Sequence, residues 1–185
     1  CFYHLVYAGR GTKMMNADAE RGQTRKAVDA ILGWCDENRE TEVLMVDNHA
    51  DGPYIYLKSL REKPERSEQI YELLKLNAGN ASGIGIGDVD NLGNVHADQF
   101  WTHHSFGNVK QRNFGDIWMD VSDPIMKGLK DRAGLIKGRC SSANCRWFTL
   151  CNGNFRVRAE AATGDVWESD PACYLTDAEI AKEGK

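Results

Sequence analysis

Apolar and polar residues follow one another along the first part of the chain as they do in parallel α/β folds. An apolar, aromatic run at residues 2–8 predicts a buried strand, and the apolar run Glu42–Val46 predicts a second one. Between them, Gln23–Arg39 predicts an amphipathic helix, since one face collects Ala27, Val28, Ile31, Leu32 and Cys35. This order predicts a βαβ unit with a parallel sheet covered by helices. A further helix is predicted over Pro64–Leu76.

From residue 82 the pattern changes to short elements. Residues 83–87 alternate Gly with Ile, Asp90–Asn94 reads as a turn, and Val95–Asp98 resumes an extended run, which together predict a β-hairpin. Short helices are predicted around Phe114–Trp118 and from Pro124 onward. The capping box Thr176-x-x-Glu179 predicts a closing helix.

The second predicted strand ends in a polar segment, Asp47–Pro53. In parallel α/β folds, ligands and catalytic groups gather at the C-terminal ends of strands. We therefore consider His49 and Asp51 candidate catalytic residues. A polar turn that caps the strand explains the same residues, because Asp, Asn, Gly and Pro all favour turns.

Composition and charge exclude some classes of partner. The net charge of -4 is mild and does not indicate binding to nucleic acid or to an anionic membrane surface. No apolar run approaches the roughly 20 residues that span a bilayer, and no signal peptide opens the chain, which predicts a cytoplasmic protein. Because the chain begins at Cys1 inside a predicted buried strand, we expect it to be the C-terminal portion of a longer protein.

Four of the six cysteines gather near the end of the chain, at positions 140, 145, 151 and 173. In a reducing compartment such a cluster favours metal ligation over disulfides. A close triplet with a remote fourth thiol suits either a tetrahedral zinc site with four thiolate ligands or a [4Fe–4S] cluster. The absence of C-x2-C pairs, together with apolar Trp147, Phe148 and Leu150 between the cysteines, favours iron–sulfur.

Several motifs resemble one known family. The run from Gly138-Arg-Cys140 to Asp170-Pro-Ala-Cys173, with the hairpin at 90–109, resembles the auxiliary-cluster (SPASM or twitch) extension of radical SAM enzymes. Residues 3–11, 46–51 and 95–101 are most similar to the branch of that family that acts in haem d1 biosynthesis. The resemblance covers nearly the whole chain.

The resemblance implies an α/β fold in two parts. Residues 1–80 would be the C-terminal strands and helices of a partial (β/α)6 radical SAM barrel, and residues 81–185 a SPASM/twitch-like α+β extension with a β-hairpin. The C-x3-C-x2-C loop of the SAM-cleaving cluster is missing from these 185 residues. The family therefore implies that SAM and a second [4Fe–4S] cluster are bound in an N-terminal half preceding Cys1, so that this chain alone is expected to be inactive.

Departures from the family pattern narrow the cofactor prediction. Members with two auxiliary clusters carry cysteines where this chain has Asp98 and Phe155, and both positions serve the same cluster. The remaining set matches the ligands of the other cluster, so the resemblance implies one auxiliary [4Fe–4S] cluster held by Cys140, Cys145, Cys151 and Cys173. The gap between the first two cysteines is wider than usual, which leaves open whether Cys140 is a ligand.

The resemblance also implies a reaction: removal of two propionate side chains from a sirohaem-derived tetrapyrrole on the way to haem d1, with electrons from a donor such as a ferredoxin or flavodoxin. His49 and Asp51 would line the barrel mouth. Arg10, Arg156 and Arg158 are candidates to pair with substrate carboxylates, although plain surface charge explains them as well. Alternatives are a porphyrin-decarboxylating haem synthase, a peptide-modifying SPASM enzyme, and a non-enzymatic zinc or iron–sulfur module.

Overall fold

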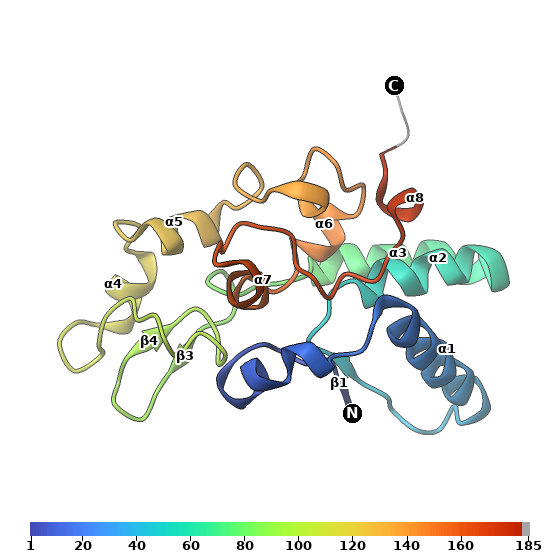
Figure 1. The fold of residues 1–185 in the computed structure, drawn as a ribbon, viewed down its shortest axis with the longest axis horizontal. Helices are drawn as coiled ribbons and strands as arrows, with labels where there is room; N and C mark the ends of the chain where they lie inside the picture. The colour runs from blue at the N-terminus through green and yellow to red at the C-terminus, as the bar shows by residue number, and fades with distance from the viewer. Residues whose placement is uncertain (183–185) are drawn as a thin grey trace.

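The computed structural model describes residues 1–182 and shows an α/β arrangement with short strands and many helices (Figure 1). None of the helices in this range is long and apolar enough to cross a membrane. In chain order the elements are β1 (Phe2–Tyr3), the 3-10 helix η1 (Gly9–Ala17), α1 (Arg21–Glu37), β2 (Met45–Val46), α2 (Asp51–Glu62), α3 (Pro64–Asn77), β3 (Asp88–Val89), β4 (Val95–His96), α4 (Phe114–Met119), α5 (Pro124–Lys130), the 3-10 helix η2 (Gly138–Cys140), α6 (Phe148–Cys151), α7 (Arg156–Thr163) and α8 (Asp177–Ile180).

The predicted βαβ unit is confirmed. β1 and β2 pair in parallel, with Phe2 opposite Met45, and α1 is the crossover between them. The first strand is shorter than the predicted run 2–8, and pairing ends after the His4 amide bonds the Val46 carbonyl. The Leu5 carbonyl, beyond the paired residues, accepts a hydrogen bond from Arg158 at 2.9 Å.

Helices α1 and α3 agree closely with the periodicity of the sequence. α1 begins with a capping box in which Glu20 and Gln23 bond each other's backbone amides. α3 has Pro64 in its first turn, where the missing N–H leaves no partner unpaired, and ends at Ala78 in the left-handed conformation.

Helix α2 was not predicted from the sequence. Gly52 and Pro53 look like helix breakers, but they lie in the first turn of α2, where proline is tolerated because that N–H has no intrahelical partner. The polar segment after β2 is therefore a helix start, and α2 packs against α3.

The β-hairpin and the short helices are confirmed, but the first strand of the hairpin lies later in the sequence than predicted. β3 and β4 pair antiparallel around Asp90, whose carboxylate accepts the backbone amides of Leu92 and Asn94. The predicted first strand, 83–87, is a turn instead, since the amides of residues 84–86 all converge on the carbonyl of Ala81. Helices α4, α5 and α8 lie where the capping and periodicity signals predicted them.

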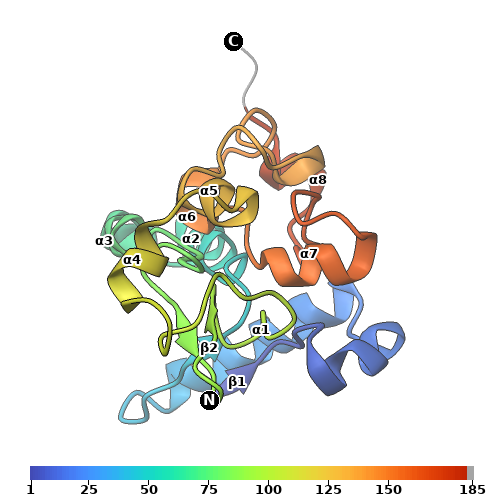
Figure 2. The same ribbon diagram turned by 90° about the vertical axis from the view of Figure 1, so that its left-hand side faces the viewer.

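Both hydrophobic clusters of the described residues contain side chains from before and after position 80. Val28 and Tyr54 from the first part pack with Trp147 and Tyr174 from the second. Arg25 of α1 forms a bidentate ion pair with Glu179 of α8, with N···O distances of 2.8 and 3.0 Å. Figure 2 shows α8 above α7, with the α1 side of the chain below them. The two predicted parts are thus closely packed, and a boundary near residue 80 stays a prediction.

Candidate metal centre and the adjoining cavity

The four clustered cysteines face one small cavity, which we call the cysteine cavity. Cys140 ends η2, Cys145 lies in the following loop, Cys151 ends α6 and Cys173 precedes α8. All four line the cavity, whose walls include apolar side chains: Ala50, Pro53, Trp147, Phe148, Leu175 and Ile180. The structure thus brings together the four thiols that the sequence selected, and none of them is in a disulfide.

The thiols of the cysteine cavity oppose one another's ionisation. Burial raises the pKa of Cys151 well above its usual range, and the charges of Cys140, Cys173 and Cys145 raise it further. Burial also raises the pKa of Cys173 to about 11, with Cys140 adding to the effect. Four thiolates in an apolar cavity are therefore unstable unless a cationic centre neutralises them, which is the chemistry of a bound metal or iron–sulfur cluster.

No three His, Cys, Asp or Glu side chains within residues 1–182 are arranged to grip a single metal ion. This does not conflict with the convergence of four thiols on one cavity. Four cysteine thiols on one cavity are a donor set that suits a [4Fe–4S] cluster and a tetrahedral zinc site alike.

Close backbone packing holds the cysteine loop against the end of α3. The Cys151 carbonyl accepts a hydrogen bond from the Asn80 amide at 3.1 Å. Gly79 has φ of 71°, and a Cβ there would lie 2.3 Å from the Cys151 carbonyl carbon. Only glycine fits at this contact, so the position of Cys151 depends on a residue far from it in sequence.

Arg139 is a cation in the wall of the cysteine cavity. Its guanidinium donates to the carbonyls of Cys173 and Leu175, at 3.1 and 2.7 Å, and pairs with Asp177 at 2.9 Å. These contacts tie η2 to the loop that carries Cys173. They also place a positive charge beside a predicted anionic cluster.

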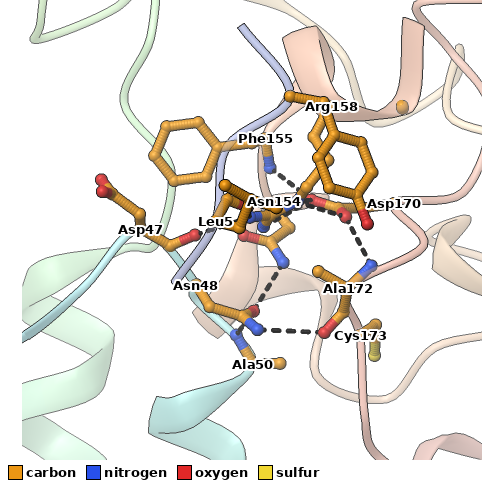
Figure 3. A network of polar contacts seen from close by, with 12 residues as sticks. Leu5, Asp47, Asn48, Ala50, Asn154, Phe155, Arg158, Asp170, Ala172 and Cys173 are labelled. Atoms are coloured by element: carbon orange, nitrogen blue, oxygen red, sulfur yellow. Dashed lines mark hydrogen bonds and ion pairs between the residues drawn. The ribbon is translucent and has the colours of Figure 1, made fainter. Parts of the chain in front are cut away.

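The structure corrects the expectation that Arg156 and Arg158 bind substrate. Both side chains are buried, at 1% and 0% exposure. Arg158 forms an ion pair with Asp170 at 2.8 Å and donates to the carbonyls of Leu5 and Asp47 (Figure 3). Arg156 donates to three backbone carbonyls, among them that of Glu168 at 2.6 Å. The Arg158 guanidinium and both Nη atoms of Arg156 donate to groups of the protein itself, so the two arginines act as structural ties, although the buried Nε of Arg156 has no partner among the described residues.

Arg10, the third candidate for substrate carboxylates, lies exposed in η1. It does not line the cysteine cavity or the larger cavity described next. Its role toward a substrate stays a prediction.

A second, larger cavity, which we call the histidine cavity, lies beside the end of β2. Its volume is about 690 Å³, and it is lined by apolar side chains together with Asp47, His49, Asp51 and Asp98. The structure thus places both predicted catalytic residues, His49 and Asp51, at one cavity. A cavity of this volume falls in the range of roughly 300–1,000 Å³ that is typical of small-molecule sites.

The carboxylate of Asp51 is engaged within the protein. One oxygen accepts the Tyr174 hydroxyl at 2.6 Å, and the other lies 2.9 Å from His4 Nε2. Asp51 therefore connects β1 and the start of α2 to the residue that follows Cys173. Tyr174, which no sequence pattern singled out, follows Cys173 of the cysteine cavity and donates to Asp51 of the histidine cavity.

Asp98 and Phe155 replace the missing cysteines by different means. Asp98 is buried and accepts the Ser82 hydroxyl at 2.5 Å and the Phe100 amide at 2.8 Å. Burial raises the pKa of Asp98, against the lowering effect of the Ser82 hydrogen bond. Phe155 fills its position with an aromatic ring that stacks on His49.

Three curated proteins are similar to the chain over nearly all of its residues. The chain is 59% identical to Fe-coproporphyrin III synthase of Methanosarcina barkeri over 97% of its own length and 46% of that protein. It is 40% identical to pre-heme d1 synthase of Dinoroseobacter shibae, over 95% of this chain and 44% of the relative. It is 27% identical to the AdoMet-dependent heme synthase of Methanosarcina barkeri, over 92% and 46%.

No family model matches the sequence, and no solved structure matches it. The chain spans a little under half the length of the curated relatives it matches. Similarity to these three synthases nevertheless extends over nearly all of its own residues, and it confirms the resemblance found in the motifs. The chain is thus similar, over nearly all of its residues, to haem-related synthases of the radical SAM family.

Proposed function

We propose that this chain is the auxiliary-cluster part of a radical SAM synthase that modifies an iron tetrapyrrole. Residues 1–80 would complete a radical SAM barrel and residues 81–185 would form its SPASM-like extension. SAM and a second [4Fe–4S] cluster would be bound by a segment outside these 185 residues. The observation that carries the proposal is the convergence of Cys140, Cys145, Cys151 and Cys173 on one cavity, in a chain related to tetrapyrrole synthases.

The relatives guide the choice of substrate. Identity is 59% with the Fe-coproporphyrin III synthase and 40% with the pre-heme d1 synthase. Both names denote products that are modified tetrapyrroles, and the first denotes one that contains iron. We therefore propose that the reaction removes carboxylate-bearing side chains from a sirohaem-derived tetrapyrrole. Formation of an Fe-coproporphyrin III-type product is the first candidate, and formation of a haem d1 precursor is the second.

The chain's own residues have defined tasks in this scheme. The four cysteines would hold the auxiliary cluster, which when bound supplies one-electron chemistry, with a ferredoxin or flavodoxin as electron donor. Arg139 fixes the Cys173 loop and offsets the negative charge of the ligands. Arg158 and Asp170 fix the start of α7 and the turn before Cys173. The histidine cavity, which adjoins the end of β2, would receive the tetrapyrrole.

The proposal is tested with the full-length polypeptide under anaerobic, reducing conditions. It is incubated with SAM and an iron tetrapyrrole that carries acetate and propionate side chains, and mass spectrometry follows 5′-deoxyadenosine and the tetrapyrrole. We expect both 5′-deoxyadenosine and a product lighter by the lost side chains. Residues 1–185 alone should form neither. Formation of no 5′-deoxyadenosine by the full-length protein, with one zinc and no iron bound, would support a non-enzymatic zinc module instead.

A further inference from the structure

His49 is held in a fixed orientation at the end of β2. Its backbone amide donates to Asn154 Oδ1 at 3.0 Å. Asn154 in turn donates to Asn48 Oδ1 at 2.8 Å, as Figure 3 shows. The imidazole ring stacks on Phe155, with 5.6 Å between ring centroids and 22° between the planes. The backbone and the ring plane are thus both fixed before any ligand binds.

The ring nitrogens of His49 differ from those of the other four histidines. His4 bonds Asp51, His96 bonds the His104 carbonyl, His103 bonds Glu160 and His104 bonds Asp123. Within residues 1–182, no hydrogen bond is formed by either ring nitrogen of His49. Neither nitrogen belongs to the buried polar atoms that lack a partner, and His49 lines the histidine cavity. Its nitrogens are therefore accessible there.

The environment favours a neutral imidazole. Burial, with a smaller contribution from the charge of Arg158, lowers the pKa of His49 to about 4. The neutral form is the one that binds transition metals through a ring nitrogen. As a general base the same group is poor, because proton-transfer catalysts have pKa values near the operating pH, and none of the described carboxylates orients its ring.

The walls of the histidine cavity suit a large, flat and mainly apolar ligand. Leu, Ile and Val side chains make up much of the lining: Leu32, Val43, Ile55, Ile70, Leu74 and Ile86. His49 is the ring nitrogen donor among the residues that line this cavity. The cysteine cavity is lined by other residues and does not include His49.

We propose that His49 binds the iron of the tetrapyrrole substrate as an axial ligand, through one of its free ring nitrogens. This inference rests on the proposed function, because it requires an iron tetrapyrrole in the histidine cavity. The ligand would fix the macrocycle at one point above the apolar wall. It would also distinguish iron-containing tetrapyrroles from metal-free ones.

The test uses the full-length polypeptide with two probes, ferric coproporphyrin III and metal-free coproporphyrin III. Binding is followed by the Soret and visible absorption bands and by electron paramagnetic resonance of the ferric iron. The variants are His49→Gly and, as matched control, His103→Gly, since His103 is a surface histidine paired with Glu160. Free imidazole is then added to each variant.

We expect the wild type and His103→Gly to show a histidine-ligated ferric spectrum. His49→Gly should lose this signature and bind the ferric probe at least about tenfold more weakly, as is usual when a ligand shell is damaged. Imidazole should restore the spectrum, which a merely misfolded variant would not show. Binding of the metal-free probe should be equal in all three proteins.

A His49→Gly protein that keeps the wild-type ferric spectrum would overturn the axial-ligand proposal while leaving the proposed function intact. Equal affinity of the wild type for the ferric and metal-free probes would also overturn it. If neither probe binds the wild type, the proposed tetrapyrrole function itself fails.

Discussion

The cysteine cavity and the histidine cavity lie in the same molecule but are encoded in different ways. The cysteine cavity takes its four thiols from one segment, residues 140–173, so that residue type and spacing reveal it. The histidine cavity is lined by residues that are spread from position 32 to position 155, and no short sequence motif predicts it. A ligand set can thus be found from sequence, whereas a substrate cavity needs the fold that assembles it.

The largest effect is expected from removing a thiol of the cysteine cavity. Cys173→Ala should abolish the absorbance of the auxiliary cluster, because three thiolates and no fourth ligand hold a [4Fe–4S] cluster poorly. Cys35→Ala, which removes a cysteine outside this cavity, is the matched control and should keep full absorbance. Equal absorbance in both variants would show that Cys173 is not a ligand.

The second-largest effect, a loss of stability, is expected from breaking the buried ion pair between Arg158 and Asp170. Asp170→Asn leaves Arg158 without its carboxylate in a site where both side chains have 0% exposure. We expect a loss of about 3–5 kcal/mol in the free energy of unfolding, as for other broken buried pairs. Urea denaturation measures the loss. Lys137→Gln, which breaks the exposed pair with Asp165, should leave stability nearly unchanged.

The lowered pKa of His49 in the histidine cavity should make the stability of the protein depend on pH. The pKa of His49 falls from 6.5 to about 4 on folding, so between these values the unfolded chain binds a proton that the folded chain does not. Stability therefore rises with pH across this window, by at most about 1.4 kcal/mol per pH unit for one proton.

The matched variant is His49→Gln, which has no group that titrates in this window. Its stability should change less between pH 5 and pH 7 than that of the wild type when urea denaturation is measured on both. An identical pH slope in the two proteins would show that His49 is not buried in its neutral form.

The smallest effect is expected for the charge beside the cysteine cavity. Arg139→Gln removes a cation next to an anionic cluster, which should favour the oxidised form and lower the midpoint potential by a few tens of millivolts, where about 59 mV is a tenfold change for one electron. Redox titration followed by electron paramagnetic resonance measures the shift. Arg112→Gln, which removes an arginine paired with Asp120, is the control and should leave the potential unchanged.

Much of the secondary structure follows from the sequence, and the failures have identifiable causes. α1, α3, α5 and α8 carry their own periodicity or capping signals. α2 was hidden because Gly52-Pro53 resembles a turn, although proline in a first helical turn costs nothing.

Helix α7 was hidden for a different reason. Two of its four buried residues are arginines, Arg156 and Arg158, and charged side chains are normally read as the exposed face of a helix. Their partners, Asp170 and a set of backbone carbonyls, become apparent only once the chain is folded. The same fact explains why both arginines looked like substrate ligands.

The residues of the candidate site could be predicted from the sequence, but the contacts that orient them could not. The four thiols could be selected from residue type and spacing, and His49 from its place after a predicted strand. The contacts that orient them, such as Asn154 to the His49 amide, join residues more than 100 positions apart. Sequence patterns of one or two turns carry no information about such pairs.

The most direct test of the central claim counts the metal held by the cysteine cavity. Iron and acid-labile sulfide are measured in the anaerobically purified full-length protein and in a variant in which Cys140, Cys145, Cys151 and Cys173 are all alanine. An auxiliary [4Fe–4S] cluster predicts that the variant has lost about four iron and four sulfide per chain. An unchanged iron content, or the loss of one zinc ion instead, would contradict the account.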